Sequence, residues 1–336
     1  MKKSFWFGIL ISAIFVFFIV YRLDFKELGT ALKSASYIFL IPIFLLFVLN
    51  LLIRSLRWQY LIKPVKKIRV KSLFSATSIG FMANMVLPVR MGEFVRAFVL
   101  GYKERISKSA SFATIVVERL LDGFTILSIL ILILTFVNFP EEMGFIGKHL
   151  KTAGYLSFVF YLFILGILIL LRLNKSRVNR WFRTIFFFLP DRVLNRLLQI
   201  LDSFESGLQI LEGGRQFFPI IFLSALLWLT VVIVNYIVFV SFHLNLPLYA
   251  PFFLVVMQAI GVMIPSSPGF IGTFHAASVI GLAFFGVSKE VALSAAIVMH
   301  AAFFIPIVTL GFIFLWTEHI SFRELQDIKE KRLTED

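Results

Sequence analysis

Residues 84–96, NMVLPVRMGEFVR, decide how this chain is expected to fold. Charged side chains and two helix-breaking residues, Pro88 and Gly92, stand here inside a segment that is otherwise apolar. The apolar run between Lys71 and Arg90 is shorter than the roughly 20 residues that a membrane-spanning helix needs. Because basic residues stand at both ends of that run, the segment predicts a re-entrant hairpin, which enters the membrane and returns on the same side.

Composition places the chain outside the soluble globular class. Its 336 residues are 59% hydrophobic and include 42 phenylalanines, and the mean hydropathy is +0.92. Apolar runs of membrane-spanning length recur from Phe5 to Trp316, so we predict a multi-pass protein of the cell membrane. A net charge of +14 suggests nucleic acid at first, but basic residues between apolar runs fit membrane orientation and anionic headgroups better. No nucleic-acid partner is expected, and the absence of cysteine excludes disulfides and thiolate metal sites.

Basic connections are retained on the cytoplasmic side of a membrane, which gives a predicted topology. Residues 54–71 carry seven basic side chains and residues 172–216 carry eight, so both stretches are predicted to be cytoplasmic. The connections at 138–151 and 243–250 carry two and none, so both are predicted to be external. Both chain termini are then expected in the cytoplasm.

The pattern predicts an all-α polytopic protein with about six spanning helices and two broken hairpins, which can also be counted as eight transmembrane segments. The spanning helices are expected at residues 5–21, 37–53, 109–137, 152–171, 217–242 and 291–316. The second hairpin is expected within residues 254–285, with its break at Pro265, Pro268, Gly269 and Gly272.

Leucines repeat at helical spacing against charged residues within 176–212, which predicts a cytoplasmic amphipathic helix lying on the membrane or on the bundle. An ordinary linker helix is the alternative. A short charged tail is expected at 317–336.

Two sequence matches predict an internal repeat inside a single transmembrane domain, residues 1–336. Leu87-Pro88-x-x-x-Gly92 matches Ile264-Pro265-x-x-x-Gly269, and ISKSASFATIVVERL from Ile106 matches VSKEVALSAAIVMHA from Val287. The units would be residues 37–137 and 217–316. Since the charge rule puts the first hairpin inside and the second outside, the units would be inverted, as in many secondary transporters. Chance similarity between apolar segments is the alternative.

Glu118, Arg119 and Asp122 form a polar cluster within the helix expected at 109–137. Spacings of three and four residues place them near one another on the helix, and the rise of about 1.5 Å per residue puts them near the membrane midplane. An ionisable group that faces lipid there costs at least about 2.5 to 3.5 kcal/mol, so these side chains must face a partner or a wet cavity. A functional site and a mutually satisfied ion network that locks helices together both fit this pattern.

Arg90, Glu93 and Arg96 in the first hairpin need partners at a similar depth. A half-helix that begins after either break points its amino terminus into the protein, and such an end attracts anions. With Arg119 nearby, the site suits a phosphate group better than a metal. The chain has no P-loop, nucleophile elbow or metal-ligand spacing, so neither a cofactor nor a metal is expected.

These residues resemble a known family, the flippase-like transmembrane domain of lysylphosphatidylglycerol synthases. The matching pieces are Arg57-Trp58 with Leu61, Asn84-x-x-Leu87-Pro88-x-Arg90-x-Gly92-Glu93-x-x-Arg96, Glu118-Arg119-x-x-Asp122, and Pro265-x-x-Pro268-Gly269-x-x-Gly272. The resemblance implies a polytopic domain that moves a lipid between leaflets, in its best-known members an aminoacylated phosphatidylglycerol. We expect substrate binding at Asn84 and at the charged residues of the hairpin and the cluster, with Arg57, His275 and His300 as polar counterparts.

The chain departs from the family pattern in two places. His275 stands where family members often carry glutamate after the turn, which leaves the charge preference for the substrate open. Only residues 317–336 follow Trp316, so the cytosolic synthase domain is expected to be absent and a synthase label is not supported.

Three functions remain at this stage. The leading hypothesis is a lipid flippase, which would not be an enzyme. The alternatives are a membrane-embedded headgroup transferase with Glu118 or Asp122 as base, and a non-catalytic membrane partner of a separate synthase or glycosyltransferase. The expected partners are membrane phospholipids, with or without such an enzyme, and the sequence leaves the oligomeric state open, a homodimer included.

Overall fold

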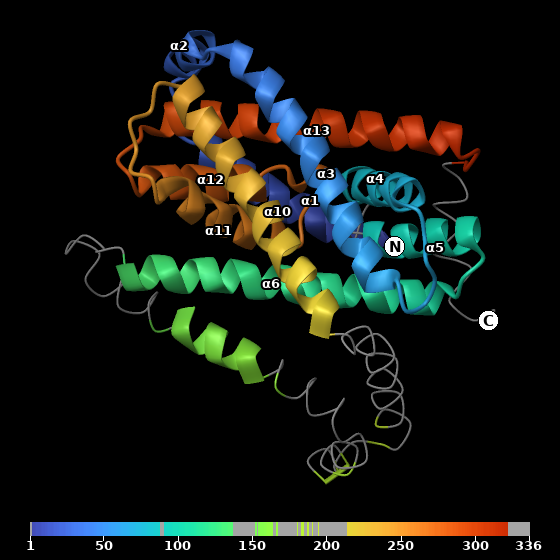
Figure 1. Cartoon of the computed structure of the whole chain (residues 1–336). Coiled ribbons are helices and arrows are strands. Elements are labelled where there is room, and N and C mark those ends of the chain that lie inside the picture. Colours follow the sequence, from blue (N-terminus) through green and yellow to red (C-terminus); the bar gives the residue numbers. More distant parts are fainter. Residues whose placement is uncertain are drawn as a thin grey trace.

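The computed structural model describes residues 2–87, 91–136, 154–163 and 214–321, together with a few single positions between 152 and 194. All regular elements in this part of the chain are helices (Figure 1). They are α1 (Lys2–Val20), α2 (Phe25–Ser34), α3 (Leu40–Ile62), α4 (Val70–Val86), α5 (Gly92–Glu104), α6 (Lys108–Phe136), α10 (Gly214–Ser241), α11 (Ala250–Met263), α12 (Thr273–Ala283) and α13 (Lys289–Thr317).

Four of these helices are long and apolar enough to cross a membrane: α3 with the 3-10 turn before it, α6, α10 and α13. The pair α1 and α2, bent by 90° between them, makes a fifth candidate, and only residues 154–163 represent the span predicted at 152–171. Large apolar side chains such as Trp6, Phe17 and Trp316 are exposed, as a lipid-facing surface requires. The prediction of an all-helical polytopic membrane protein is confirmed.

The helix predicted at 37–53 is longer than expected, because α3 continues to Ile62. Arg54 and Arg57, which the charge count assigned to a cytoplasmic connection, therefore lie inside this helix, and both are buried. The prediction was wrong at these two residues because it took every basic residue as a topology signal, whereas these two are neutralised by buried carboxylates described below. The connection after residue 21 also contains a helix that was not predicted, α2.

Both predicted hairpins are pairs of helices too short to span a bilayer separately. Helices α4 and α5 have 17 and 13 residues, α11 and α12 have 14 and 11, and a spanning helix needs about 20. The second break is made by a 3-10 turn, Pro268–Phe270, and by positive φ angles at Gly269 and Gly272, a region that favours glycine.

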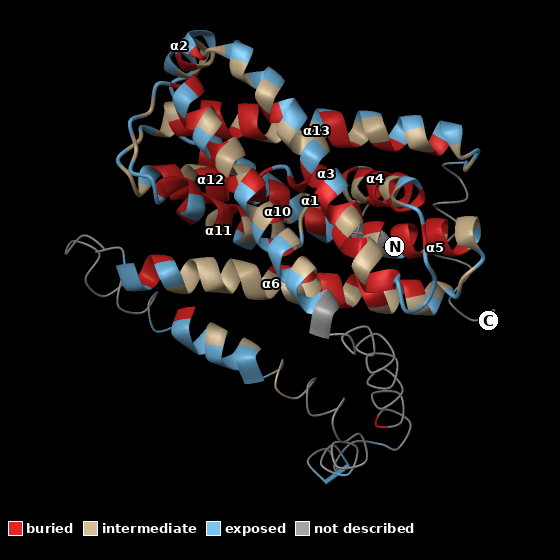
Figure 2. Cartoon of the chain, in the orientation of Figure 1, coloured by how far each residue is buried: buried red, intermediate tan, exposed pale blue. Residues whose placement is uncertain are grey.

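The two hairpins are arranged alike. In Figure 1, α6 and α13 run along opposite edges, hairpins α4/α5 and α11/α12 lie between them on opposite sides, and α3 and α10 lie side by side. Helix packing follows the same correspondence, since α4 packs on α13 as α11 packs on α6, and α5 packs on α6 as α12 packs on α13. The buried residues gather where these elements meet (Figure 2).

A close contact inside each hairpin recurs at one sequence offset. A Cβ atom on Gly80 would lie 2.8 Å from Arg96 Cβ and 2.9 Å from the Gly92 carbonyl oxygen. A Cβ atom on Gly261 would lie 2.6 Å from Ala277 Cβ and 2.7 Å from the Thr273 carbonyl oxygen, and each of these residues stands 181 positions after its counterpart. The hairpins thus share a packing contact at the offset of the Ile106 and Val287 match, while inversion of the units across a membrane stays a prediction.

Several predicted features lie outside the described residues. They are Pro88 and Arg90 in the first hairpin, the connection at 138–151, the amphipathic helix at 176–212 except for single positions, and the tail beyond residue 321.

Candidate functional site

The site begins with one polar stripe on α3. Asn50, Arg54 and Arg57 are spaced by four and three residues, which places them on one face of the helix, and all three are buried. The Asn50 side chain donates to the Leu227 carbonyl oxygen at 3.0 Å and to Thr230 Oγ1 at 2.7 Å on α10. Since Asn50 Oδ1 also accepts from Arg54 Nε at 3.0 Å, the amide fixes the direction of the guanidinium group.

The strongest ion pair joins α5 to α6. Arg96 donates from Nη1 and Nη2 to the two carboxylate oxygens of Glu118 at 2.8 and 3.0 Å, a bidentate geometry. The Arg96 guanidinium also lies 3.8 Å from the ring centroid of Trp58, and the Trp58 indole donates to Thr114 Oγ1. Charge, stacking and hydrogen bonding therefore hold α3, α5 and α6 together at one point.

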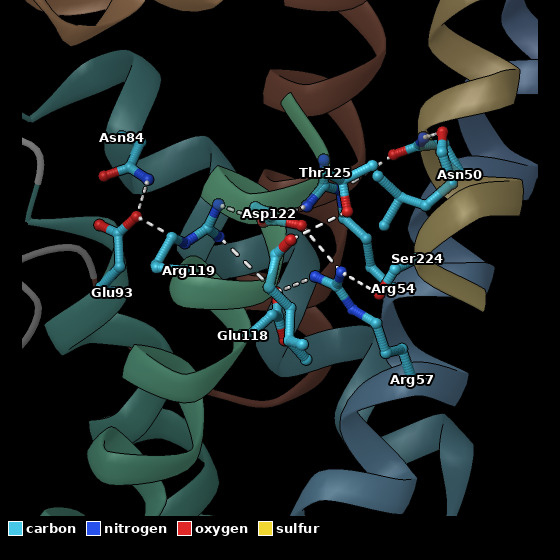
Figure 3. A network of polar contacts seen from close by, with 12 residues as sticks. Asn50, Arg54, Arg57, Asn84, Glu93, Glu118, Arg119, Asp122, Thr125 and Ser224 are labelled. Atoms are coloured by element: carbon cyan, nitrogen blue, oxygen red, sulfur yellow. Dashed lines mark hydrogen bonds and ion pairs between the residues drawn. The ribbon is translucent and has the colours of Figure 1, made fainter. Parts of the chain in front are cut away.

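Asp122 extends the network toward α3 and α10. Its Oδ1 atom accepts from Arg57 Nη1 at 2.8 Å, and its Oδ2 atom accepts from Arg119 Nη1 at 3.1 Å. Arg54 Nη1 lies 3.5 Å from the same Oδ2 atom. Arg57 Nη1 also donates to Ser224 Oγ on α10 at 3.0 Å. Figure 3 shows these side chains converging from several helices onto the carboxylates of Glu118 and Asp122.

The first hairpin connects to this network through its cap. Asn84 near the end of α4 accepts from the Gly92 backbone N–H at 2.7 Å and donates to Glu93 Oε1 at 3.3 Å. The same Glu93 oxygen lies 3.5 Å from Arg119 Nε. Asn84 therefore satisfies an N–H group at the start of α5 and orients the carboxylate that faces Arg119.

The network carries one unbalanced positive charge within the described residues. Its ion pairs involve four guanidinium groups, of Arg54, Arg57, Arg96 and Arg119, and three carboxylates, of Glu93, Glu118 and Asp122. More than a third of the Arg119 side chain is exposed, whereas Arg57 and Glu118 are fully buried. The cluster is thus a tight ion network with a net charge of +1 and with an accessible side.

A cavity of about 290 Å³ lies against that side. Residues of both predicted units border it: α3, α4, α5 and α6 belong to the first unit, and α10, α11, α12 and α13 belong to the second. Its polar border consists of Asn50, Arg54, Asn84, Glu93, Arg119, Trp228, Thr230, Asn235 and Gln258. The remainder is apolar, including Phe47, Phe81, Phe270 and Phe303, so the cavity combines a charged wall with a surface suited to hydrocarbon.

The second unit contributes an uncharged polar group. Asn235 and Gln258 form a reciprocal amide pair, with Asn235 Nδ2 donating at 3.1 Å and Gln258 Nε2 donating at 3.3 Å. Gln258 Nε2 also lies 3.4 Å from Ser278 Oγ and from Met299 Sδ. Met299 stands 181 positions after Glu118, so in the predicted repeat a thioether corresponds to the central carboxylate.

The structure brings together most of the residues that the sequence singled out. Asn84, Glu93, Arg96, Glu118, Arg119, Asp122 and Arg57 form the network and its cap. His275 and His300 lie apart from this network in the described part of the chain; their ring centroids are 4.8 Å apart, and His300 Nε2 lies 2.7 Å from the Gly269 carbonyl oxygen in the second turn.

Sequence reasoning missed Asn50, Arg54, Asn235 and Gln258. The stripe of Asn50, Arg54 and Arg57 at helical spacing inside an apolar run was a usable signal, and a lone amide in an apolar helix is a weaker one.

Fold and site together define a multi-pass helical membrane protein with a buried charged network beside a cavity between its helical units. The chain belongs to the family described as the lysylphosphatidylglycerol synthase TM region, whose model matches residues 5–311. The resemblance noted from the motifs is therefore confirmed.

Three relatives show how far this similarity extends. The glycosyltransferase AglD of Haloferax volcanii is 23% identical over 88% of this chain, and the chain spans only 51% of that relative. UPF0104 membrane proteins of Methanothermobacter thermautotrophicus and Methanocaldococcus jannaschii are 23% and 22% identical, over 85% and 91% of this chain and 87% and 92% of theirs. No solved structure matches the chain.

Proposed function

We propose that this protein carries a phosphate-containing lipid between the two leaflets of a membrane. The observation that supports this most is the cavity bordered by Arg54 and Arg119, which belong to a network with a net charge of +1. An uncompensated charge at membrane depth costs at least about 2.5 kcal/mol. A phosphodiester monoanion bound beside these arginines would remove that cost, because it carries the single negative charge that the network lacks.

The rest of the cavity fits the remainder of such a lipid. Its headgroup would lie against the polar wall, and its acyl chains would lie along the apolar lining and the surrounding bilayer. Two units that change their contacts around a fixed site would then expose it to one leaflet and afterwards to the other, as in transporters built from inverted repeats. We propose that both termini of the chain lie in the cytoplasm, as the basic connections indicate.

Reconstitution into vesicles tests the transport directly. Phospholipids with a fluorescent tail are placed in one leaflet, and their exchange is followed with the wild type, with Arg119→Gln and with Lys26→Gln, which alters an exposed residue of α2. We expect the wild type and Lys26→Gln to accelerate exchange and Arg119→Gln to lose most of it. No acceleration for any phospholipid or polyprenyl-phosphate carrier would rule the function out.

A second experiment tests the inversion that this transport requires. Since the chain contains no cysteine, Arg90→Cys and Ser267→Cys each introduce a single labelling site. A membrane-impermeant thiol reagent should label the two positions from opposite sides. Labelling of both positions from the same side would show that the two units are not inverted.

A second candidate function is that of a non-catalytic membrane partner of a separate transferase. It is favoured by the similarity to AglD, which is named a glycosyltransferase and of which this chain matches about half. The chain itself is poorly suited to catalysis as a headgroup transferase, because the carboxylates of Glu118 and Asp122 are each held by several arginines. Retention of a copurifying enzyme after deletion of residues 191–212 would argue against docking through the predicted amphipathic helix.

A further inference from the structure

We propose that the cavity recognises a headgroup in which a phosphodiester is joined to hydroxyl groups, as in glycerol or a sugar, and that it discriminates against headgroups bearing an ammonium group. This inference rests on the proposed lipid transport, which makes a lipid the source of the headgroup. It adds the chemical class of the substrate and assigns recognition to residues of both units.

The anion would bind beside Arg54 on α3 and Trp228 on α10, which both border the cavity. Arg54 is buried, with 7% of its surface exposed, and its direction is fixed by the bond from Nε to Asn50. Trp228 Nε1 is a buried N–H group that has no hydrogen-bond partner among the described residues. Arg54 Nη1 also makes no hydrogen bond there, and it lies 3.5 Å from the Asp122 carboxylate. A buried donor without a partner is costly, so an acceptor that reaches both groups is bound favourably. A phosphodiester offers two charged oxygens for this.

An ammonium group would meet a single carboxylate at the described border of the cavity, and that carboxylate already has partners. Among the described residues that border the cavity, only Glu93 is acidic. Its Oε1 atom already accepts from Asn84 at 3.3 Å and lies 3.5 Å from Arg119 Nε. A cationic headgroup would therefore add charge of the same sign to a network whose net charge is already +1, and like charges repel strongly at low dielectric.

Hydroxyl groups would bind beside Asn235 and Gln258, which border the same cavity. An amide has two N–H donors and a carbonyl oxygen with two lone pairs, and the reciprocal bonds between these residues use only part of that capacity. The remaining groups include both donors and acceptors, which matches a hydroxyl group, itself both donor and acceptor. Asn235 stands 181 positions after Arg54, so equivalent places in the two units carry an amide and a guanidinium group.

Binding to the full chain in phosphatidylcholine nanodiscs tests the preference. Native mass spectrometry would compare phosphatidylglycerol, phosphatidylmethanol and lysylphosphatidylglycerol with identical acyl chains. Phosphatidylmethanol keeps the phosphodiester charge without the headgroup hydroxyls. We expect phosphatidylglycerol to bind about tenfold or more tightly than lysylphosphatidylglycerol and several-fold more tightly than phosphatidylmethanol. Glycerophosphoglycerol, the free headgroup, is added as a competitor, and displacement of the lipid by it at similar concentration would refute a lipid source.

Variants test the phosphate contacts and the hydroxyl contacts separately. Trp228→Phe should weaken binding of phosphatidylglycerol and phosphatidylmethanol equally, about five- to tenfold, whereas Trp316→Phe, which alters a residue that is 81% exposed, should change neither. Asn235→Leu with Gln258→Leu should abolish the preference between these two lipids and leave phosphatidylmethanol binding in place. Equal binding of lysylphosphatidylglycerol and phosphatidylglycerol by the wild type overturns the inference without any variant.

The outcomes also distinguish this inference from the transport function. If vesicles exchange lipid rapidly but lysylphosphatidylglycerol binds best, the transport function stands and the inference fails. If phosphatidylglycerol binds with the expected preference but no lipid is exchanged, the site stands and the transport function fails.

Discussion

Replacement of Glu118 by glutamine should destabilise the protein strongly, because this carboxylate is the centre of the ion network. It accepts two hydrogen bonds from Arg96 and lies 3.4 Å from Arg57 Nη2 and 3.7 Å from Arg119 Nη2. Glutamine keeps the size and shape of the side chain but removes its charge. The network would change from a net charge of +1 to +2 in a fully buried position.

The expected size follows from the cost of an unpaired buried charge. Breaking a buried ion pair by removal of one partner costs about 3–5 kcal/mol. A destabilisation of 1 kcal/mol lowers the midpoint by about 2 °C in a chain at or above 250 residues, so the midpoint of Glu118→Gln should fall by about 6–10 °C. The control variant Glu27→Gln, which removes the charge of an exposed residue on α2, should have a midpoint within about 1 °C of the wild type.

Thermal unfolding of the purified protein in one detergent, followed by intrinsic tryptophan fluorescence, measures these midpoints. The double variant Arg96→Met/Glu118→Gln restores the net charge of +1, because it removes one charge of each sign. It should recover at least half of the loss seen in Glu118→Gln alone. The stabilising role of the bidentate pair is refuted if the fall in midpoint of the double variant equals the sum of the falls in Arg96→Met and Glu118→Gln. It is also refuted if Glu118→Gln has the same midpoint as Glu27→Gln.

Three other substitutions, with one control, test the hairpin and the contact between α3 and α10 by the same unfolding assay. Gly92→Ala should prevent folding or lower the midpoint more than any other change here, since its Cβ atom would lie 2.1 Å from the Gly80 carbonyl oxygen, whereas Gly29→Ala, with nothing within 4 Å, should raise stability slightly. A raised midpoint for Gly92→Ala contradicts the contact. Asn84→Ala removes the cap of α5 and should cost about 1 kcal/mol, and an unchanged midpoint would show that the cap is not formed. Asn50→Leu should destabilise the contact between α3 and α10 by at least about 1 kcal/mol. It should also slow lipid exchange, because the Arg54 side chain loses the hydrogen bond that orients it. Full stability with full exchange would refute this.

Much of the fold followed from the length of apolar runs and from their breaks. The long helices α6, α10 and α13 begin and end within a few residues of the predicted bounds, because a membrane-spanning run gives a strong and continuous signal. The predicted end of α3 at residue 53 is too early, because a basic residue directly after an apolar run indicates the end of a membrane span. Whether a guanidinium group ends a span or is buried in it depends on a carboxylate far away in the sequence, and no local pattern contains that information.

The candidate site was predictable to the extent that its members stand in local motifs. Glu118, Arg119 and Asp122 are neighbours on one helix, and Arg96 lies in the hairpin that packs against it. Asn235 and Gln258 could not be assigned from sequence, because each is a lone amide in an apolar helix and their mutual bond joins α10 to α11. The role of Arg54 depends on its ion pair with Asp122, 68 positions later, and on its hydrogen bond to Asn50 on the adjacent turn.

The position of Asn50 indicates how the two units share the cavity. Its side chain donates hydrogen bonds to Leu227 and Thr230, which stand 177 and 180 positions later in the chain. These separations are close to the 181-residue offset of the predicted repeat, so Asn50 contacts residues next to its equivalent position in the second unit. If a twofold axis relates the units, such a contact is made near that axis, and the cavity that Asn50 borders would lie there too. The charges do not follow this symmetry, because the guanidinium and carboxylate groups of the network all belong to α3, α5 and α6. If the units exchange conformations, we expect the phosphate of the headgroup to stay beside the arginines of the first unit, while the second unit changes its contacts. Separating the phosphate from Arg54 and Arg119 at membrane depth would cost more than breaking hydrogen bonds to amides.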